Sequence, residues 1–229
     1  MAKNLSFFSS GKLLITSEYA VIDGACALAL PTKLGQSMTV INNKEPAIHW
    51  VAKDVDGSIW FEDHFHVNDF QSTLQTNETT GLLQQILLVA RELNPGFLSN
   101  PIGYNIETQL GFSKDWGLGS SSTLVNNVAQ WANVNPFYVQ EKVFGGSGYD
   151  IACAEKRNSI TYQLIDQKPT VVDVAFKPPF HEYLFFVYFF LLFFLLVVVV
   201  LLLLVLLLLL LLHHHIHHRH HHHHHHHHH

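Results

Sequence analysis

Cysteines and basic clusters are scarce in this sequence, and each scarcity excludes a class of protein. The 229 residues include only two cysteines, Cys26 and Cys153, which lie far apart in apolar contexts. We expect buried thiols rather than a disulfide, as in proteins of a reducing compartment. Acidic residues outnumber Lys and Arg by 18 to 13, and no basic stripe is interleaved with aromatic residues, so nucleic acid is not an expected partner.

The chain changes composition twice, which divides it into three parts. Residues 1–183 carry the mixture of charges, turns and apolar residues typical of a globular domain, without an internal repeat and without an apolar signal-peptide core at residues 1–6. Residues 184–212 are all Phe, Leu, Val or Tyr, and residues 213–229 are histidine apart from Ile216 and Arg219. We expect the functional domain in the first part and a cytoplasmic location.

The apolar run at residues 184–212 is longer than the roughly 20 residues that span a bilayer. It contains no glycine, alanine or tryptophan, however, and no basic residue closely flanks either end. We therefore interpret the run as a low-complexity artefact, with a transmembrane helix as the alternative, and a membrane is an expected partner only if the run is genuine. The histidine-rich tail could bind a divalent metal as an affinity tag does.

Short apolar or alternating stretches bounded by turn signals predict a strand-rich first half. Residues 62–80 are polar and irregular and are expected to form a loop. Strands come first and helices follow, an order that favours an α+β fold over a doubly wound sheet. The expected strands are residues 4–9, 12–16, 25–30 (closed by Pro31), 36–41, 47–52, 57–61, 102–110, 159–165 and 170–176, and the expected helices are residues 81–94, 121–133, 136–144 and a stretch that begins near 147.

Three histidines, His49, His64 and His66, are scattered between an expected strand and the expected loop. No metal-ligand spacing in the sequence joins them to a carboxylate or a cysteine. We therefore expect these histidines to be structural.

The stretch with the clearest chemistry is residues 117–123, Gly-Leu-Gly-Ser-Ser-Ser-Thr, which precedes an apolar helical pattern. Glycines allow a tight turn that comes close to a ligand, and serine and threonine are frequent N-caps of helices. The N–H groups at such a helix start point outward and favour an anion, of which phosphate is the usual one. An ordinary glycine turn capped by serine is the alternative, and the commoner origin of so short a motif.

Two further stretches join this loop in an order that resembles the GHMP kinases, the superfamily of galactokinase, homoserine kinase, mevalonate kinase and phosphomevalonate kinase. Residues 10–24 (Ser-Gly-Lys-Leu-Leu-Ile-Thr-Ser-Glu-Tyr-Ala-Val-Ile-Asp-Gly) resemble the first motif, and residues 117–122 resemble the second, the phosphate loop. Residues 147–152 (Ser-Gly-Tyr-Asp-Ile-Ala) resemble the segment that carries the catalytic aspartate in the mevalonate branch. The Gly-Tyr-Asp-Ile-Ala string is similar to a bacterial subgroup of the superfamily.

This resemblance implies a fold as well as a function. Residues 1–183 would form the GHMP kinase N-terminal domain, a mixed sheet with helices packed on one face, and the start of a second domain. The family's third motif, a glycine-rich loop, has no counterpart in the sequence. The C-terminal ferredoxin-like domain is therefore expected to be largely missing.

Family members use ATP and Mg²⁺ to phosphorylate a small molecule, a reaction that depends on positioning and charge neutralisation. The resemblance gives Asp150 the role of orienting or deprotonating the acceptor, and Lys12 that of pairing with Asp150 or steadying the transferred group. Ser121 and Glu141 would hold Mg²⁺. The phosphates of ATP would bind at Gly117, Leu118, Gly119, Ser120, Ser121 and Ser122. The acceptor would bind near Glu18, Tyr19, Ser147 and Gly148.

Local context leaves simpler roles open for the charged residues among these. Without the family motifs Lys12 would be interpreted as a solvated lysine, Asp150 as a helix cap and Glu141 as a surface residue of a helix. The motifs also depart from the family pattern: Ser17 replaces a usual glycine and Ser113 a usual proline. Tyr19 and Asp23 replace histidines common in mevalonate kinases, and this favours a phosphomevalonate-like acceptor.

The sequence thus predicts an ATP-dependent small-molecule kinase that acts on a mevalonate- or phosphomevalonate-like acceptor of isoprenoid biosynthesis. Because the third motif is missing, we expect a truncated chain that is weakly active or inactive. Two alternatives stay open, a catalytically dead nucleotide-binding fragment and a membrane-anchored protein. The sequence does not indicate an oligomeric state.

Overall fold

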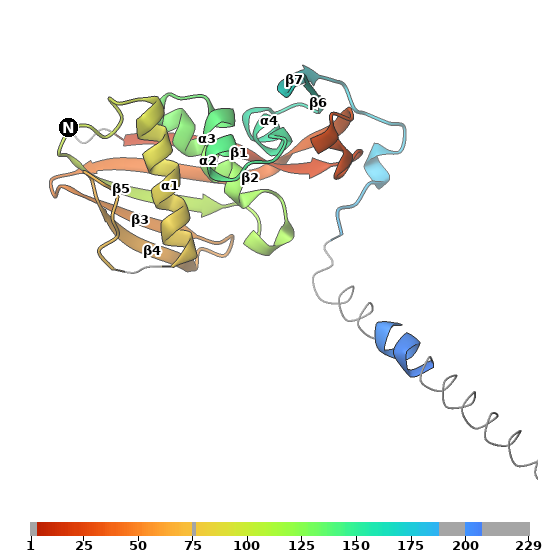
Figure 1. Ribbon diagram of the computed structural model, residues 1–229, viewed down its shortest axis with the longest axis horizontal. Helices are drawn as coiled ribbons and strands as arrows, with labels where there is room; N and C mark the ends of the chain where they lie inside the picture. The colour runs from red at the N-terminus through yellow and green to blue at the C-terminus, as the bar shows by residue number, and fades with distance from the viewer. Residues whose placement is uncertain (1–3, 75–76, 188–199, 208–229) are drawn as a thin grey trace, which may run out of the picture. The chain divides into compact units, whose positions relative to one another are not determined.

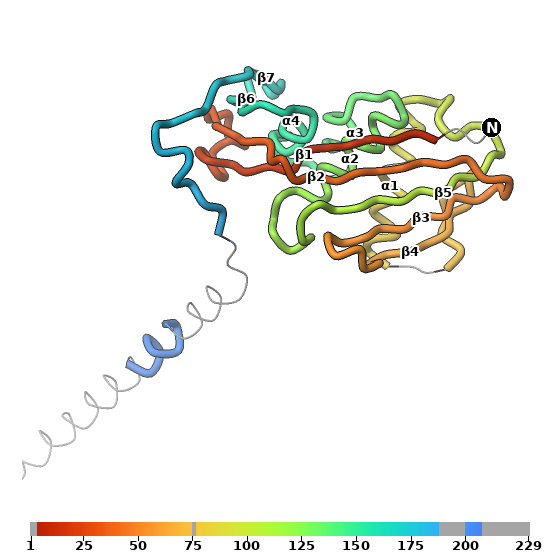
Figure 2. Tube along the Cα trace, turned by 180° about the vertical axis from the view of Figure 1, so that it is seen from behind, coloured from red at the N-terminus to blue at the C-terminus, as the bar shows by residue number. Residues whose placement is uncertain are grey.

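The structure is a computed structural model that describes residues 4–74, 77–187 and 200–207. It divides into two compact units, Met1–His181 and Glu182–His229, and the first holds the sheet and the four α-helices named below. Figure 1 shows helices α1, α2 and α3 in front of the sheet, and Figure 2 shows the opposite face, with these three helices behind it. The expected α+β architecture, with helices on one face of a mixed sheet, is confirmed.

Within the described residues, seven strands form one sheet in the order β4-β3-β5-β2-β6-β7, with β1 paired to β2. Neighbouring strands are antiparallel except β3 and β5, which run parallel. The long strand β2 pairs with β5 near its end and with β6 near its start, so it joins the two parts of the sheet. The strands are β1 (Asn4–Leu14), β2 (Ala27–Asn43), β3 (Ala47–Lys53), β4 (Ile59–His66), β5 (Gly103–Leu110), β6 (Ile160–Ile165) and β7 (Lys168–Asp173).

The two longest helices pack on the sheet through apolar side chains. Ile86 of α1 and Val128 of α2 are fully buried in one core with Trp50 of β3 and Phe65 of β4. Burying a large apolar side chain stabilises a fold by roughly 1.5–3 kcal/mol, so this core holds both helices in place. The helices are α1 (Glu78–Leu93), α2 (Ser120–Ala132), α3 (Pro136–Val143) and α4 (Tyr149–Glu155), and the short 3₁₀ helices are η1 (Ala20–Asp23), η2 (Lys114–Trp116) and η3 (His181–Tyr183).

Two interruptions that the sequence predicted near the beginning of the chain do not break the strands. Residues 4–9 and 12–16 were expected as two strands, but β1 continues through Gly11 with a register shift between Ser10 and Lys12. Pro31 was expected to close a strand, but β2 passes through it. Proline is tolerated here because β2 pairs only with β1 at this point, opposite Lys12, so the missing N–H removes no second ladder bond.

The expected loop at residues 62–80 was wrong at both ends. Strand β4 extends to His66, with Asp63 fully buried between outward-facing polar residues. The Asp63 carboxyl group accepts hydrogen bonds from the hydroxyls of Ser72 and Thr80, at 2.8 Å each, so its buried oxygens have partners. Helix α1 begins at Glu78 because Asn77 caps it by accepting a hydrogen bond from the Thr80 N–H.

The two cysteines differ in environment. Both are free thiols, as expected, but Cys26 is exposed and only Cys153 is buried. Burial, and then the charge of Asp150, raise the pKa of the Cys153 thiol to about 12. The expectation that both thiols are buried was wrong for Cys26, because Asp23 and Gly24 turn the chain at the surface just before it.

A thiol reagent is therefore expected to modify Cys26 in the folded protein and both cysteines in denaturant. The reactive species is the thiolate, which is scarce for a buried thiol of raised pKa. Peptide mass spectrometry after brief alkylation measures the two sites separately. Equal modification of Cys26 and Cys153 in the folded protein would contradict this packing.

The apolar run and the histidine-rich tail belong mostly to parts of the chain outside the described residues. Residues 188–199 and 208–212 of the run, and all of residues 213–229, fall in those parts. Residues 200–207 form a helix in the second unit. Among the residues that the structure describes, no helix combines the length and the apolar character needed to cross a membrane.

Candidate active site

The turn before helix α2 depends on two glycines in the left-handed backbone region. Gly117 has φ 70° and Gly119, the N-cap of α2, has φ 87°. A Cβ atom at Gly119 would lie 2.7 Å from Ser122 Oγ and 3.1 Å from Lys12 Cγ, so only glycine fits between these side chains. The turn therefore brings the start of α2, with its unpaired backbone N–H groups, close to Lys12.

Leu118 fastens this turn to the domain. Its side chain is buried with Leu110 and Phe112, and its carbonyl oxygen accepts a hydrogen bond of 2.9 Å from the Lys12 N–H. Gly11 allows the close approach, because a Cβ atom there would lie 3.0 Å from the Leu118 carbonyl oxygen. The first and second motifs are thus joined through their backbones.

Buried polar side chains of β1 and β2 hydrogen-bond to α2 and fix its direction. Ser9 Oγ donates to Asn127 Oδ1 at 2.8 Å, and Asn127 Nδ2 donates to the backbone oxygen of Gln36 at 3.0 Å. Thr123 Oγ1 donates to Gln36 Oε1 at 3.2 Å. These hydrogen bonds tie α2 to β1 and β2 in one arrangement. Sequence reasoning missed these residues, because their partners lie about ninety to one hundred and twenty positions away.

Asp150 approaches the same turn from helix α4. Gly148, with φ 84°, caps α4, so the second residue of the helix, Asp150, points toward β1. Lys12 Nζ lies 2.9 Å from Asp150 Oδ1 and donates a hydrogen bond of 2.7 Å to Tyr149 Oη. The side chains of Lys12 and Asp150 are 19% and 29% exposed, which leaves both open to a ligand on one side.

The surroundings keep Lys12 charged and Tyr149 neutral. Burial lowers the pKa of Lys12, but the charge of Asp150 and the hydrogen bonds to Tyr149 and Asp150 outweigh it, so the pKa lies above its ordinary value. Burial raises the pKa of Tyr149, and the charges of Asp150 and Glu18 add to this, although Lys12 opposes it. A fixed ammonium group therefore stands beside the carboxylate at neutral pH.

Lys12 and Asp150 line one cavity of about 250 Å³ together with the turn before α2. Ser122 holds the turn closed by donating from Oγ to the Gly119 carbonyl oxygen at 3.0 Å. The cavity walls are Lys12, Gly117, Gly119, Ser120, Ser121, Ser122, Gln140 and Asp150. All of these except Gln140 are candidates from the sequence. We call this space the loop cavity.

Gln140 lines the loop cavity but was not named from the sequence, which gave its neighbour Glu141 as a candidate metal ligand. Helix α3 buries Pro136 and Val139, so Gln140 faces inward and Glu141, turned a further 100°, is exposed. Gln140 Nε2 donates to the Gly145 carbonyl oxygen at 3.2 Å. Its Oε1 is buried and has no hydrogen-bond partner among the described residues. The helical phase set by Val139 was the signal that could have found it.

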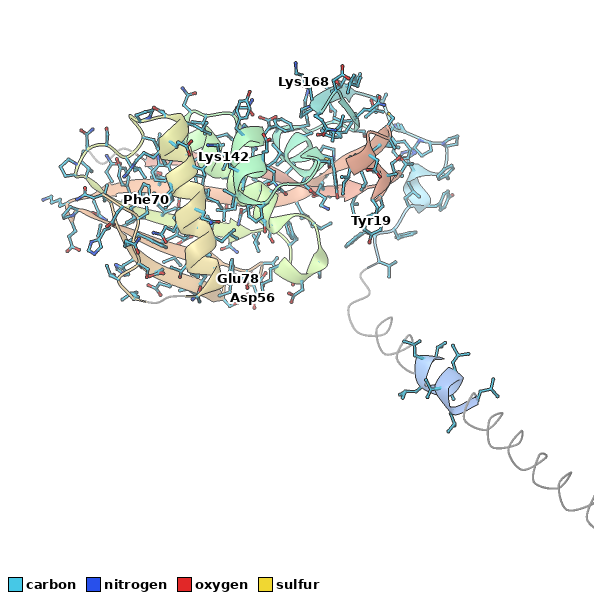
Figure 3. The ribbon with its side chains drawn as sticks, in the orientation of Figure 1. Tyr19, Asp56, Phe70, Glu78, Lys142 and Lys168 are labelled. Atoms are coloured by element: carbon cyan, nitrogen blue, oxygen red, sulfur yellow. The ribbon has the colours of Figure 1, made fainter. Side chains whose placement is uncertain are left out.

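The structure places the other candidates outside the loop cavity. Glu141, Ser147 and Gly148 line a neighbouring cavity of about 580 Å³, bounded on its other side by the β6–β7 hairpin. Glu18 is exposed but lies near enough to raise the pKa of Tyr149. Tyr19 is 82% exposed and projects from the end of the domain opposite Phe70 and α1, as Figure 3 shows.

The turn that carries Glu18 holds two residues other than glycine in an unusual backbone conformation. Ser17 has φ 63° and Tyr19 has φ 65°, both in the left-handed region. A residue other than glycine is strained there. Ser17 compensates by donating from Oγ to the Cys26 carbonyl oxygen at 2.7 Å.

No family model matches the sequence, and no curated protein matches it significantly. Solved structures match the fold. A mevalonate kinase from Methanococcus jannaschii matches with TM-score 0.57 and 14% identity, over 79% of this chain and 58% of that one. A galactokinase from Lactococcus lactis, complexed with galactose, matches with TM-score 0.56 and 14% identity, over 76% and 48%. A phosphomevalonate kinase from Streptococcus pneumoniae, in complex with phosphomevalonate and AMPPNP, matches with TM-score 0.52 and 19% identity, over 71% and 50%.

These neighbours are kinases of the GHMP superfamily, and the chain has the fold of their N-terminal domain. The chain spans 58% or less of the length of each of the three. At these identities the likeness concerns the fold, and the bacterial subgroup indicated by Gly-Tyr-Asp-Ile-Ala stays a prediction.

Proposed function

We propose that this chain belongs to an ATP-dependent small-molecule kinase of the GHMP type, in which the loop cavity binds the phosphates of ATP. One observation carries the proposal: the glycine-serine turn, the Lys12 ammonium and the Asp150 carboxylate line the same cavity, although they come from three separate stretches of sequence. A capped surface turn would not need a partly buried lysine and an aspartate against it. A cytoplasmic location, where ATP is available, belongs to the same proposal.

Each group has a role that follows from its chemistry. The N–H groups of Gly119, Ser120 and Ser121 at the start of α2 would donate to phosphate oxygens, where the helix dipole favours negative charge. Lys12 would neutralise charge on the transferred phosphoryl group. Asp150 would orient the acceptor and take its proton. Its Oδ1 lies 2.9 Å from Lys12 Nζ, so the two charged groups would act on the same phosphoryl transfer.

The cavity also fits a magnesium ion in its donor set. Mg²⁺ prefers oxygen ligands, often few from the protein, with phosphate oxygens and water as the rest. The Ser121 hydroxyl and the unpartnered Oε1 of Gln140 are such oxygens, and no lysine or arginine other than Lys12 lines the cavity walls described above. We therefore propose Ser121 and Gln140 for this role. Glu141, the candidate from the sequence, lines the neighbouring cavity instead. When bound, Mg²⁺ would neutralise phosphate charge.

The acceptor that we propose is a phosphomevalonate- or mevalonate-like acid. Tyr19 and Asp23 in the first motif support this choice, and Glu18, Ser147 and Gly148 are the candidates for its binding. The test is Mg²⁺-dependent transfer of labelled γ-phosphate from ATP by the full chain, with mevalonate, phosphomevalonate, homoserine and galactose in parallel. We expect product with one of the first two. Product with galactose alone would overturn the acceptor, and absence of both binding and transfer would overturn the function.

Nucleotide binding without transfer is the second candidate function. It is one of the alternatives left open by the sequence, and it requires only that the loop cavity hold the phosphates. The same experiment separates the two functions, because this candidate predicts binding of Mg²⁺–ATP with no labelled product from any acceptor.

Gln140→Ala is expected to weaken the Mg²⁺-dependent part of AMPPNP binding by about tenfold or more, as loss of a group that holds or orients a metal does. Glu141→Ala, one position along the same helix, is the matched control and should leave affinity unchanged within about twofold, since the side chain lies outside the loop cavity. Calorimetric titration with and without Mg²⁺ measures both. A larger loss in Glu141→Ala than in Gln140→Ala would restore the original candidate.

A further inference from the structure

Two histidines and a glutamate meet on the side of the sheet that lies away from the helices. His49 of β3 is directly opposite His64 of β4 in the strand register. Their rings stack with centroids 4.3 Å apart and an interplanar angle of 21°. His49 Nε2 lies 2.7 Å from Oε1 of Glu62, which precedes His64 by two residues on the same strand. We call these three residues the His49 cluster.

Strand alternation places the three side chains on this face. Ile48 and Trp50, which flank His49, are buried in the core under the helices. Asp63 and Phe65, which flank His64, are also fully buried. Since successive side chains of a strand point to opposite faces, His49, Glu62 and His64 must share the other face, which Figure 2 shows with α1, α2 and α3 behind it.

The distances within the cluster suit a single metal ion. One possible ligand atom from each of the three side chains lies within 4.8 Å of the others. Ligand atoms bound to one Zn²⁺ at about 2.0–2.2 Å sit roughly 3.4 Å apart in tetrahedral geometry, so side-chain rotations that separate the two stacked rings would bring all three onto an ion. His49 and Glu62 have side chains 33% and 47% exposed, which leaves room for these rotations and for entry of an ion.

We propose that His49, Glu62 and His64 bind a divalent transition-metal ion, with Zn²⁺ as the best match. Two imidazole nitrogens and one carboxylate oxygen are a set that Zn²⁺ favours, with a fourth position left for water. The site lies on β3 and β4, whereas the loop cavity is formed by β1, α2, α3 and α4. It is therefore separate from the proposed kinase function and does not depend on it.

A measurement of total metal binding would not test this site, because the histidine-rich tail at residues 213–229 is also expected to bind the ion. Stability provides the selective signal. An ion that binds only the folded protein stabilises it, whereas one that binds the folded and unfolded chain alike does not. The His49 cluster exists only when β3 and β4 pair, and the tail is common to every variant compared.

The experiment is reversible urea unfolding of the full chain, followed by tryptophan fluorescence, over a series of Zn²⁺ concentrations. We expect Zn²⁺ to raise the urea midpoint of the wild type. His64→Gln and the nearly isosteric Glu62→Gln should each lose most of this shift and require at least about tenfold more Zn²⁺ for the remainder. His66→Gln is the matched control, because His66 is the next residue of β4 on the same face but lies outside the cluster, and it should keep the full shift.

Unfolding curves without metal check that each variant is folded before the shifts are compared. Absence of a Zn²⁺-dependent shift in the wild type would overturn the proposal. An equal shift in wild type, Glu62→Gln and His64→Gln would also overturn it, since the ion would then bind elsewhere in the folded chain. Loss of the shift in His66→Gln together with the other two would show that the three residues named are not the site.

Discussion

Asp150→Asn is expected to reduce phosphoryl transfer by about 10²–10⁴-fold, the usual contribution of a positioned acid or base. Asparagine keeps the shape of the side chain but can neither take a proton nor carry the charge that pairs with Lys12 at 2.9 Å. Nucleotide affinity should change only a few-fold, because the phosphates are held by the turn rather than by this side chain. The measurement is a steady-state rate with the acceptor that gives product, together with the AMPPNP dissociation constant.

Asp173→Asn is the control for that comparison. Asp173 also pairs with a lysine, Lys156, at 2.8 Å, but this pair lies outside the loop cavity. An exposed pair of this kind contributes about 1 kcal/mol or less, so transfer should stay within about twofold of wild type. Unchanged transfer in Asp150→Asn would remove Asp150 from the reaction, and an equal loss in both variants would show that the effect is one of stability.

Gly119→Ala is expected to lower nucleotide affinity at least tenfold and to destabilise the domain by about 1–3 kcal/mol, the range for a strained backbone position. Its φ of 87° disfavours alanine, and the new Cβ would meet Ser122 Oγ at 2.7 Å and Lys12 Cγ at 3.1 Å. Relief of these contacts must move the first turn of α2 or the lysine, and both carry the proposed phosphate site. Titration with Mg²⁺–AMPPNP and urea unfolding measure the two effects.

Gly117→Ala separates strain from crowding. Gly117 also has a positive φ, 70°, but a Cβ atom there would meet nothing within 4 Å. Gly117→Ala should therefore lower the free energy of unfolding by about 1–2 kcal/mol, the strain of a left-handed residue. Its loss of nucleotide affinity should be much smaller than that of Gly119→Ala. Equal losses of affinity in the two variants would contradict the claim that Gly119 is needed for close approach.

The turn of the loop cavity could be predicted from the sequence because its residues are neighbours in the chain. Gly119, Ser120 and Ser121 lie within one short turn, and the backbone requirements of such a turn select residue types directly. Asp150 and Lys12 are 138 positions apart, and they were linked only through the order of the family motifs; the structure brings them to 2.9 Å. Local patterns also predicted the helices on the sheet, because apolar spacing marks the face that packs.

The features that sequence reasoning missed depend on register or phase. His49 and His64 meet because β3 and β4 pair with one alignment, which a shift of a single residue would destroy. Gln140 rather than Glu141 enters the cavity because Val139 sets the rotation of α3. Strand β2 continues through Pro31 because it pairs there with β1 alone. Each of these is decided by packing with distant residues, which no local pattern records.

The most direct test of the central claim is a backbone amide NMR titration of the full chain with Mg²⁺–AMPPNP. If the turn before α2 holds the phosphates beside Asp150, the amide signals of Gly119, Ser120, Ser121 and Asp150 should shift together with one saturation curve. AMPPNP binding that shifts signals elsewhere and leaves these four unmoved, or no saturable shift at all, would contradict the account.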